Sequence, residues 1–77
     1  MNEKLIDYQQ MGERIKAARR ERKMTQKELA DRTELCASYI CHIERGVKHS
    51  SIESIAAICR ALKMDANYLL FGEHWTG

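Results

Sequence analysis

The sequence is poor in turn-forming residues and in aromatic residues. Proline is absent from its 77 residues, glycine occurs four times, and aromatic side chains make up 6% of the chain. With few turn residues and no runs of aromatic or β-branched side chains, a sheet of short strands is excluded and the composition predicts an all-α fold. A chain of this length has room for one domain with a small core.

Long apolar stretches are also missing. No apolar run approaches the roughly 20 residues of a membrane-spanning helix, and residues 1–10 lack the apolar segment of a signal peptide. We therefore expect a cytoplasmic protein without a membrane partner.

The cysteines do not form a recognisable site. Cys36, Cys41 and Cys59 are an odd number, and the first two fall on one predicted helix, badly placed to bridge each other, so we expect reduced thiols. Cys41 and His42 point about 100° apart on that helix, which excludes the thiolate–imidazole couple of a nucleophilic enzyme. The C-x-x-C spacing of a zinc site is absent, and a metal or redox sensor that includes His49 is the weaker alternative. The sequence predicts no enzyme, metal or cofactor.

Positive charge is slight overall but unevenly distributed. The net charge of +2 is a weak argument for a polyanionic partner. Between Met11 and His49, however, ten Lys and Arg residues accompany six Asp and Glu, whereas the flanks hold three against five. A basic excess indicates a nucleic-acid surface when a binding motif lies in the same segment. Without such a motif, the run Arg19–Lys23 is better explained as the solvated face of a helix.

The segment 24–46 predicts two short helices joined by a tight turn. Thr25 and Glu28 have the spacing of a capping box, and Met24 and Leu29 have that of a hydrophobic staple. The first helix should therefore begin directly after the capping threonine.

The turn falls at residues 33–35, and the second helix runs from Cys36 or Ala37 to Arg45. Ile40 and Ile43 are spaced to point inward. Gly46 is suited to the left-handed conformation that ends a helix. The side chains left facing outward are those of Ala37, Ser38, Cys41, His42 and Arg45.

An N-terminal helix is predicted by a second capping signature. Asp7 is followed by Gln10 at the spacing of a capping box, which places the helix start near Tyr8. Apolar residues then recur on one face up to Lys23.

Two helices are predicted after the motif. Ser50 or Ser51 is placed to cap the first, and the second covers residues 66–71 and ends before Gly72. The first has the most strongly apolar face in the chain and should hold the core together. That face consists of Ile52, Ile55, Ile58, Cys59 and Leu62.

An ordered set of motifs gives the chain a family resemblance. It comprises MGERIKAARRERKMTQKELADRT, SYICHIERG, SIESIAAICRAL and YLLFG, which together span about four-fifths of the chain. Their order in one frame resembles the Cro/repressor-type (XRE-like) helix-turn-helix DNA-binding domain. The resemblance implies a compact five-helix bundle of the lambda-repressor-like type. We expect a single domain over residues 1–77, with a core of about 8–72, the motif at 25–46, and flanking tails at 1–7 and 73–77.

The resemblance also implies which residues read DNA. In this family the first residues of the second motif helix read base edges in the major groove. By position these are Ala37 and Ser38, with Cys41 and His42 one turn further along. None is a bidentate reader such as arginine, so each contact should contribute less than the roughly 1–3 kcal/mol of a good bidentate pair.

Arg19 and Glu44 match a family pair in which an arginine and a glutamate meet beneath the surface. The alternative is that both side chains are charges exposed to solvent. Two departures from the family pattern concern turns, since Glu34 and Lys63 stand where glycine is usual. A non-glycine residue with positive φ costs roughly 1 kcal/mol, so these turns are expected to be mildly strained.

Phosphate contacts are implied around the same helix. Free backbone N–H groups at the N-terminal end of the first motif helix suit a phosphate oxygen. The loop after the second motif helix is short and basic. The implied contacts are Gln26, Arg45, Lys48, His49 and Ser50, with Arg14 and Lys27 at the edge of the footprint.

The function implied is sequence-specific binding of double-stranded DNA by a transcriptional regulator, either a repressor or a controller. One domain makes too few base contacts for useful specificity, so we expect a homodimer on a pseudo-palindromic operator. The alternative is a protein-interaction module, such as an antitoxin or adaptor with the same fold. The predicted dimer interface consists of apolar side chains that a small core cannot cover, namely Tyr68, Leu70, Phe71 and Trp75.

Overall fold

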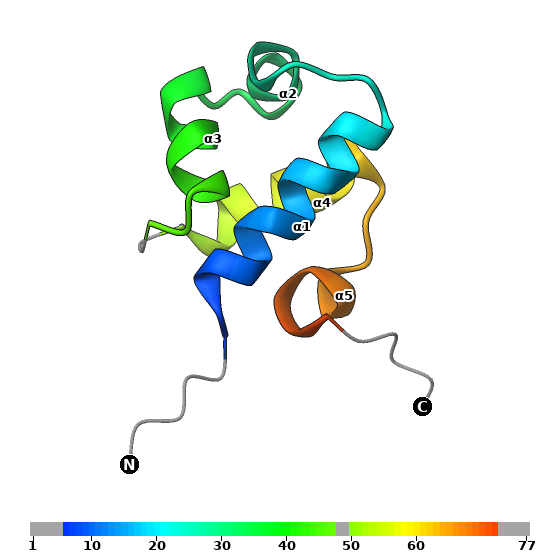
Figure 1. Cartoon of the computed structure of the whole chain (residues 1–77). Helices are drawn as coiled ribbons and strands as arrows, with labels where there is room; N and C mark the ends of the chain where they lie inside the picture. Colours follow the sequence, from blue (N-terminus) through cyan, green and yellow to red (C-terminus); the bar gives the residue numbers. More distant parts are fainter. Residues whose placement is uncertain (1–5, 48–49, 73–77) are drawn as a thin grey trace.

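Five α-helices make up the described part of the chain (Figure 1). The computed structural model describes residues 6–47 and 50–72 and contains no strand there, so the predicted all-α fold is confirmed. None of these helices is both long and apolar enough to span a lipid bilayer. The helices are α1 (Tyr8–Glu21), α2 (Gln26–Thr33), α3 (Ala37–Glu44), α4 (Ile52–Leu62) and α5 (Ala66–Phe71).

Capping side chains define where most of the helices begin. The box predicted at α2 is complete, because the Thr25 hydroxyl accepts from the Glu28 backbone N–H at 3.0 Å and the Glu28 carboxylate accepts from the Thr25 N–H at 2.8 Å. The box at α1 is incomplete, since the Gln10 side-chain oxygen accepts instead from Arg14 at 3.1 Å. The four side chains that cap a helix are those of Asp7, Thr25, Ser51 and Asp65.

The core lies between the helices, with α1 packed against α3, α4 and α5, and α2 packed against α3 and α4; α2 and α5 lie at opposite ends (Figure 1). Its apolar side chains are buried in a single cluster to which all five helices contribute. The largest fully buried side chains are Met11, Ile15, Leu29, Ile40, Ile58, Leu62 and Leu69.

One part of the predicted apolar face is wrong. Ile52, expected to be buried with the rest of the α4 face, is 87% exposed. The buried stripe of α4 instead runs through Ser54, Ile58 and Leu62, at intervals of four residues. Ile52 lies on the same side of α4 as the buried Cys59, seven residues on, so its exposure comes from its place at the end of the helix, where this side borders an open groove. An apolar side chain therefore stands on the surface at the first residue of α4.

Three connections between helices contain a non-glycine residue in the left-handed conformation. Glu34 (φ 60°) and Lys63 (φ 53°) end α2 and α4, at the two positions where the sequence predicts strained turns. Lys23 (φ 56°) is a third such residue, after α1. Within residues 6–47 and 50–72, only Gly46 (φ 83°) and Gly72 (φ 73°) adopt positive φ without the cost of a side chain.

Helix α1 passes very close to the end of α3. At Gly12 on α1, an added Cβ would collide with the backbone carbonyl oxygens of Ile43 and Glu44. A glycine is therefore required for the two backbones to approach this closely. This close contact holds the C-terminal end of α3 against α1.

Candidate nucleic-acid interface

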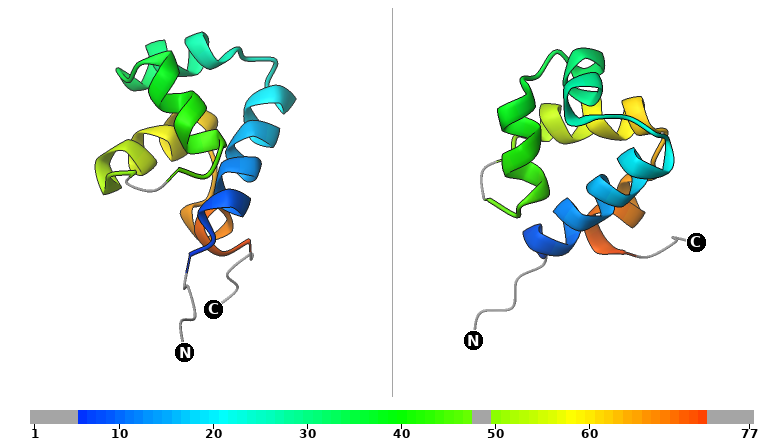
Figure 2. Two further views of the ribbon diagram at one scale, coloured as in Figure 1. Left: turned by 60° about the vertical axis from the view of Figure 1, so that its left-hand side comes forward. Right: turned by 45° about the horizontal axis from the view of Figure 1, so that its top comes forward.

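Helices α2 and α3 form the helix-turn-helix that the sequence predicts. They pack against each other at one edge of the molecule, as both views in Figure 2 show. The turn between them passes through Glu34 in the left-handed conformation, and the Leu35 backbone N–H donates to the Ala30 carbonyl at 3.1 Å. This bond closes the turn and sets the start of α3 at Ala37.

Helix α3 has a buried face and an exposed face. Ile40 and Ile43 are buried against α1 and α2. On the outer face, Ser38, His42 and Arg45 are exposed, as the apolar spacing predicts. The two remaining positions of that face, Ala37 and Cys41, are half-buried, and Ala37 packs partly against the core.

A buried ion pair holds the far end of α3. Arg19 Nε lies 2.7 Å from Glu44 Oε2 and Arg19 Nη2 lies 3.1 Å from Glu44 Oε1, so the guanidinium grips the carboxylate with two hydrogen bonds. Both residues are 7% exposed. The hydrogen bond to Glu44 raises the pKa of Arg19 above its already high ordinary value, which keeps the guanidinium charged at any accessible pH.

The Arg19–Glu44 pair also connects the C-terminal part of α1 and the C-terminal end of α3 to the start of α2. Arg19 Nη1 also donates to the Met24 carbonyl at 2.7 Å, in the loop before α2. Gln26 Nε2, on the first residue of α2, donates to Glu44 Oε1 at 3.0 Å. The N-terminal end of α2 is thereby fixed beside the C-terminal end of α3.

Gln26 thus has a second role that the sequence does not reveal. The side chain assigned to a phosphate contact is half-buried and bonded to Glu44. The backbone remains suited to an anion, because the first N–H groups of a helix have no acceptor within it and Thr25 satisfies only that of Glu28. At this position the helix terminus, more than the amide side chain, offers the anion site.

Two predicted phosphate contacts do not fit their positions. The Arg14 guanidinium lies against α5, donating to the Leu69 carbonyl at 3.0 Å and standing 6.0 Å from the centre of the Tyr68 ring. The Ser50 hydroxyl oxygen is buried and has no hydrogen-bond partner among the described residues, so it does not face a phosphate. Arginine and serine are common phosphate ligands, and residue type alone does not show which way they point.

The other basic positions remain available. Arg45 is exposed at the end of α3, and Lys27 is exposed on α2, where it makes only a long 3.5 Å contact with Asp31. Lys48 and His49 lie outside the described residues. Within the described surface, positive charge therefore lies at the C-terminal end of α3 and on α2.

Cys36 has surroundings that the sequence analysis missed. It is exposed at the N-cap of α3, and its Sγ lies 3.3 Å from the Ser38 Oγ. Hydrogen bonds from the Ser38 hydroxyl, and secondarily from the Tyr39 backbone N–H, lower the pKa of this thiol. The serine two residues after a cysteine at a helix start is the signal that could have identified it.

Tyr39 is the second missed residue. It is half-buried on α3, and its hydroxyl accepts from the Ser51 backbone N–H at 3.3 Å. This bond links α3 to the start of α4. Among the described residues, moreover, no three His, Cys, Asp or Glu side chains come close enough together to hold a metal ion.

Comparison with known proteins identifies the family. The sequence matches the model of the helix-turn-helix domain over residues 12–74. The chain belongs to this family. The resemblance to Cro/repressor-type proteins is also confirmed, because the helix-turn-helix domain is 38% identical over 60 residues to the immunity repressor of Bacillus phage phi105, covering 78% of this chain and 42% of that protein. The chain thus spans less than half the length of that relative.

Two solved structures show how closely the helix-turn-helix domain follows the family fold. The P22 c2 repressor, crystallised with a synthetic operator, superposes with a TM-score of 0.78 at 33% identity, over 82% of this chain and 96% of that one. The restriction-modification controller C.AhdI from Aeromonas hydrophila gives 0.77 at 28% identity, over 83% and 93%.

Proposed function

We propose that this protein regulates transcription by binding a specific sequence of double-stranded DNA, as a repressor or controller. The observation that carries the proposal is the fixed geometry of α3. Its outer face presents Ser38 and His42 to solvent, while Arg19 and Glu44 lock its far end to α1 and to the start of α2. A helix held in this way fits the major groove of B-DNA as a rigid unit.

The exposed side chains of α3 suit base edges. Ser38 can donate or accept a hydrogen bond, and His42 can donate to N7 or O6 of guanine. The half-buried Ala37 and Cys41 offer smaller apolar surfaces, of the kind that packs on a thymine methyl. Because no bidentate reader is present among these four, specificity arises from several modest contacts.

Phosphate contacts position the helix in the groove. The N-terminal end of α2 offers backbone N–H groups and the positive end of a helix dipole. Arg45 adds charge at the C-terminal end of α3 and Lys27 adds charge on α2, and Lys48 and His49 follow Arg45 in the sequence. These groups contact the backbone of any DNA, so they contribute affinity more than specificity.

A homodimer on a pseudo-palindromic operator completes the proposal. The few base pairs that one recognition helix reads recur too often among the 10⁶ or more competing sites of a genome. Two copies with their α3 helices about 34–36 Å apart read two half-sites on one side of the duplex. The names of the similar proteins, a phage immunity repressor and a restriction-modification controller, support a regulatory role.

Selection of bound sequences from a random pool of double-stranded DNA tests this function. The expected result is enrichment of one pseudo-palindromic sequence. If six to ten phosphates are contacted, its affinity should fall about 10³ to 10⁵-fold between 50 and 200 mM salt. A pool that yields no enriched sequence would refute the proposal and favour the alternative, in which the fold serves as a protein-interaction module.

A further inference from the structure

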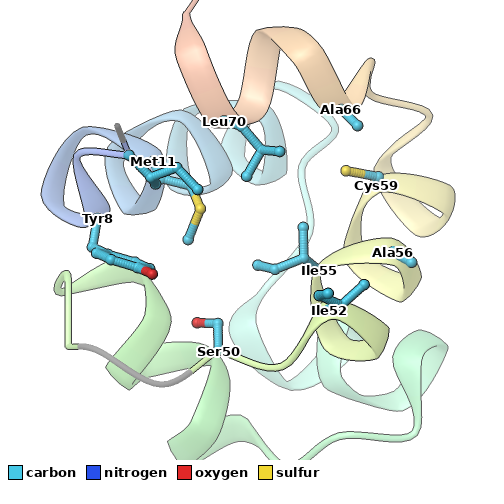
Figure 3. Close-up of a pocket in the computed structure, with 10 residues that line it drawn as sticks. Tyr8, Met11, Ser50, Ile52, Ile55, Ala56, Cys59, Ala66 and Leu70 are labelled. Carbon is cyan, nitrogen blue, oxygen red and sulfur yellow. The ribbon is translucent and has the colours of Figure 1, made fainter. Parts of the chain in front are cut away.

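An apolar groove of about 570 Å³ lies between the start of α1, α4 and α5 (Figure 3). Figure 3 shows Met11, Ile55 and Leu70 pointing into it from these three helices. No charged side chain lines it among the residues that the structure describes. Of the described residues proposed to contact DNA, only Ser50 lines it, and that hydroxyl is buried. The groove and the exposed face of α3 are therefore separate surfaces, joined by the loop after α3.

Ile52 stands at the edge of this groove. Its 87% exposure is far greater than that of any other large apolar side chain described. Single apolar residues on a surface are ordinary, but a protruding isoleucine beside an apolar hollow forms one continuous patch. The patch contains both a projection and a cavity, so it can be complementary to its own copy about a twofold axis.

Two charged side chains on α4 are arranged so that they could pair across such a twofold axis. Glu53 and Arg60 are exposed on α4, and neither belongs to an ion pair among the described residues. Seven residues are nearly two helical turns, so the two lie on the same side of α4, about 10 Å apart along its axis. Ala56, small and exposed, lies near the midpoint between them. An antiparallel copy of α4 centred there brings each glutamate opposite the other copy's arginine.

We propose that two copies of the chain associate through this groove, with their α4 helices antiparallel across a twofold axis near Ala56. Ile52 of each copy enters the groove of the other near Cys59 and Leu70, and Glu53 pairs with Arg60 across the axis. The inference rests on the proposed function for the existence of a dimer, and it specifies the surface. The small side chain of Ala56 lets the two helices approach closely.

The proposed surface differs from the interface predicted from sequence. Of the residues named there, Leu70 lines the groove, whereas Tyr68 stands beside the Arg14 guanidinium on a different side of α5. Phe71 is 41% exposed but does not line the groove, and Trp75 lies outside the described residues. The groove interface therefore depends on Ile52 and not on Phe71, whereas the interface predicted from sequence depends on Phe71 and not on Ile52.

Sedimentation of the free protein distinguishes the two interfaces. Ile52→Asp should weaken the dimer by about 10² to 10⁴-fold, because two isoleucines lose their burial. The variant should still fold, since Ile52 is exposed and an acidic residue is favourable in the first turn of a helix. Phe71→Asp is the matched control and should dimerise as the wild type does. A dimer that tolerates Ile52→Asp and is lost with Phe71→Asp would overturn the groove in favour of the helix 5 interface.

Charge reversal tests the pairing. Glu53→Arg and Arg60→Glu should each weaken the dimer about tenfold, and the double variant should recover wild-type association because the pairs form again with their signs exchanged. Additive losses in the double variant would overturn the antiparallel arrangement. These measurements need no DNA. A groove-mediated dimer that binds no DNA would refute only the proposed function, and DNA binding by a dimer insensitive to Ile52→Asp would refute only this inference.

Discussion

Arg19 and Glu44, 25 residues apart in the sequence, meet in a buried two-point ion pair at the base of the recognition helix. Removing one partner leaves the other charge buried and unpaired. We expect Arg19→Ala and Glu44→Ala each to lower the free energy of unfolding by about 3–5 kcal/mol. Arg19→Met combined with Glu44→Leu should recover much of the loss, because neither charge then remains. Urea denaturation of the three variants measures this, and a double variant as unstable as either single one would contradict it.

Different residues of α3 and its C-terminal end are expected to read bases and to bind phosphates. His42→Ala should change which operator sequences are preferred, because the exposed imidazole lies on the outer face of α3, which is proposed to read base edges. Arg45→Ala should weaken binding to all sequences nearly equally and reduce the slope of log K against log salt by about 1. Sequence selection and salt titration of each variant provide the measurements. Both residues are exposed, so each variant serves as the folding control for the other.

Arg14 provides a check on the same experiment. Its guanidinium is held by the end of α5 and by Gln10, away from the proposed DNA contacts. Arg14→Ala should therefore leave the salt slope unchanged. If Arg14→Ala reduced the salt slope as much as Arg45→Ala does, Arg14 would contact a DNA phosphate despite its position against α5.

Thiol reactivity should be greatest at Cys36. Its lowered pKa gives it a larger thiolate fraction than an ordinary cysteine at neutral pH, so its alkylation rate should reach a plateau at lower pH. Burial raises the pKa of the Cys59 thiol, which should react last. Mass spectrometry after brief treatment with iodoacetamide at pH 7 reports the order of reaction. Alkylation should abolish DNA binding in the wild type and spare Cys36→Ser. Inhibition of Cys36→Ser at the wild-type rate would instead identify Cys41 as the sensitive thiol.

Gly12 is expected to be intolerant of the smallest side chain. A glycine inside a helix normally costs about 0.5–1 kcal/mol relative to alanine. Here the added Cβ would meet the carbonyl oxygens of Ile43 and Glu44, which are backbone atoms and cannot rotate away. Gly12→Ala should therefore destabilise the protein by about 1–3 kcal/mol. The neighbouring exposed Glu13→Ala should change the unfolding free energy little, and a stabilised Gly12→Ala would show that α1 and α3 can separate.

The helix boundaries were predictable because their signals are local. Asp7, Thr25 and Ser51 cap their helices through contacts within three residues, and such contacts follow from the sequence without knowledge of the fold. The buried stripe of α3 was predictable for the same reason, since the spacing of Ile40 and Ile43 specifies one side of a helix.

The errors concern direction relative to distant elements. Ile52 has the residue type of a core position, yet it stands at the first residue of α4, where it is 87% exposed. Arg14 has the type of a phosphate ligand, yet α5 folds back over it. The double role of Gln26 depends on Glu44, 18 residues away. Residue type and spacing contain no information about which neighbour a side chain meets.

The division of α3 into two faces bears on how readily its target can be altered. Its attachment to the fold rests on the buried Ile40, Ile43 and Glu44 and on the Tyr39 hydroxyl. Ser38 and His42 lie on the open side, where the Ser38 hydroxyl contacts only Cys36 of the same helix start among the described residues. Exchange of these two residues therefore carries little thermodynamic cost. A library randomised at two codons should yield variants that remain folded while recognising different operators, which makes this small domain suitable for engineering new regulatory specificities.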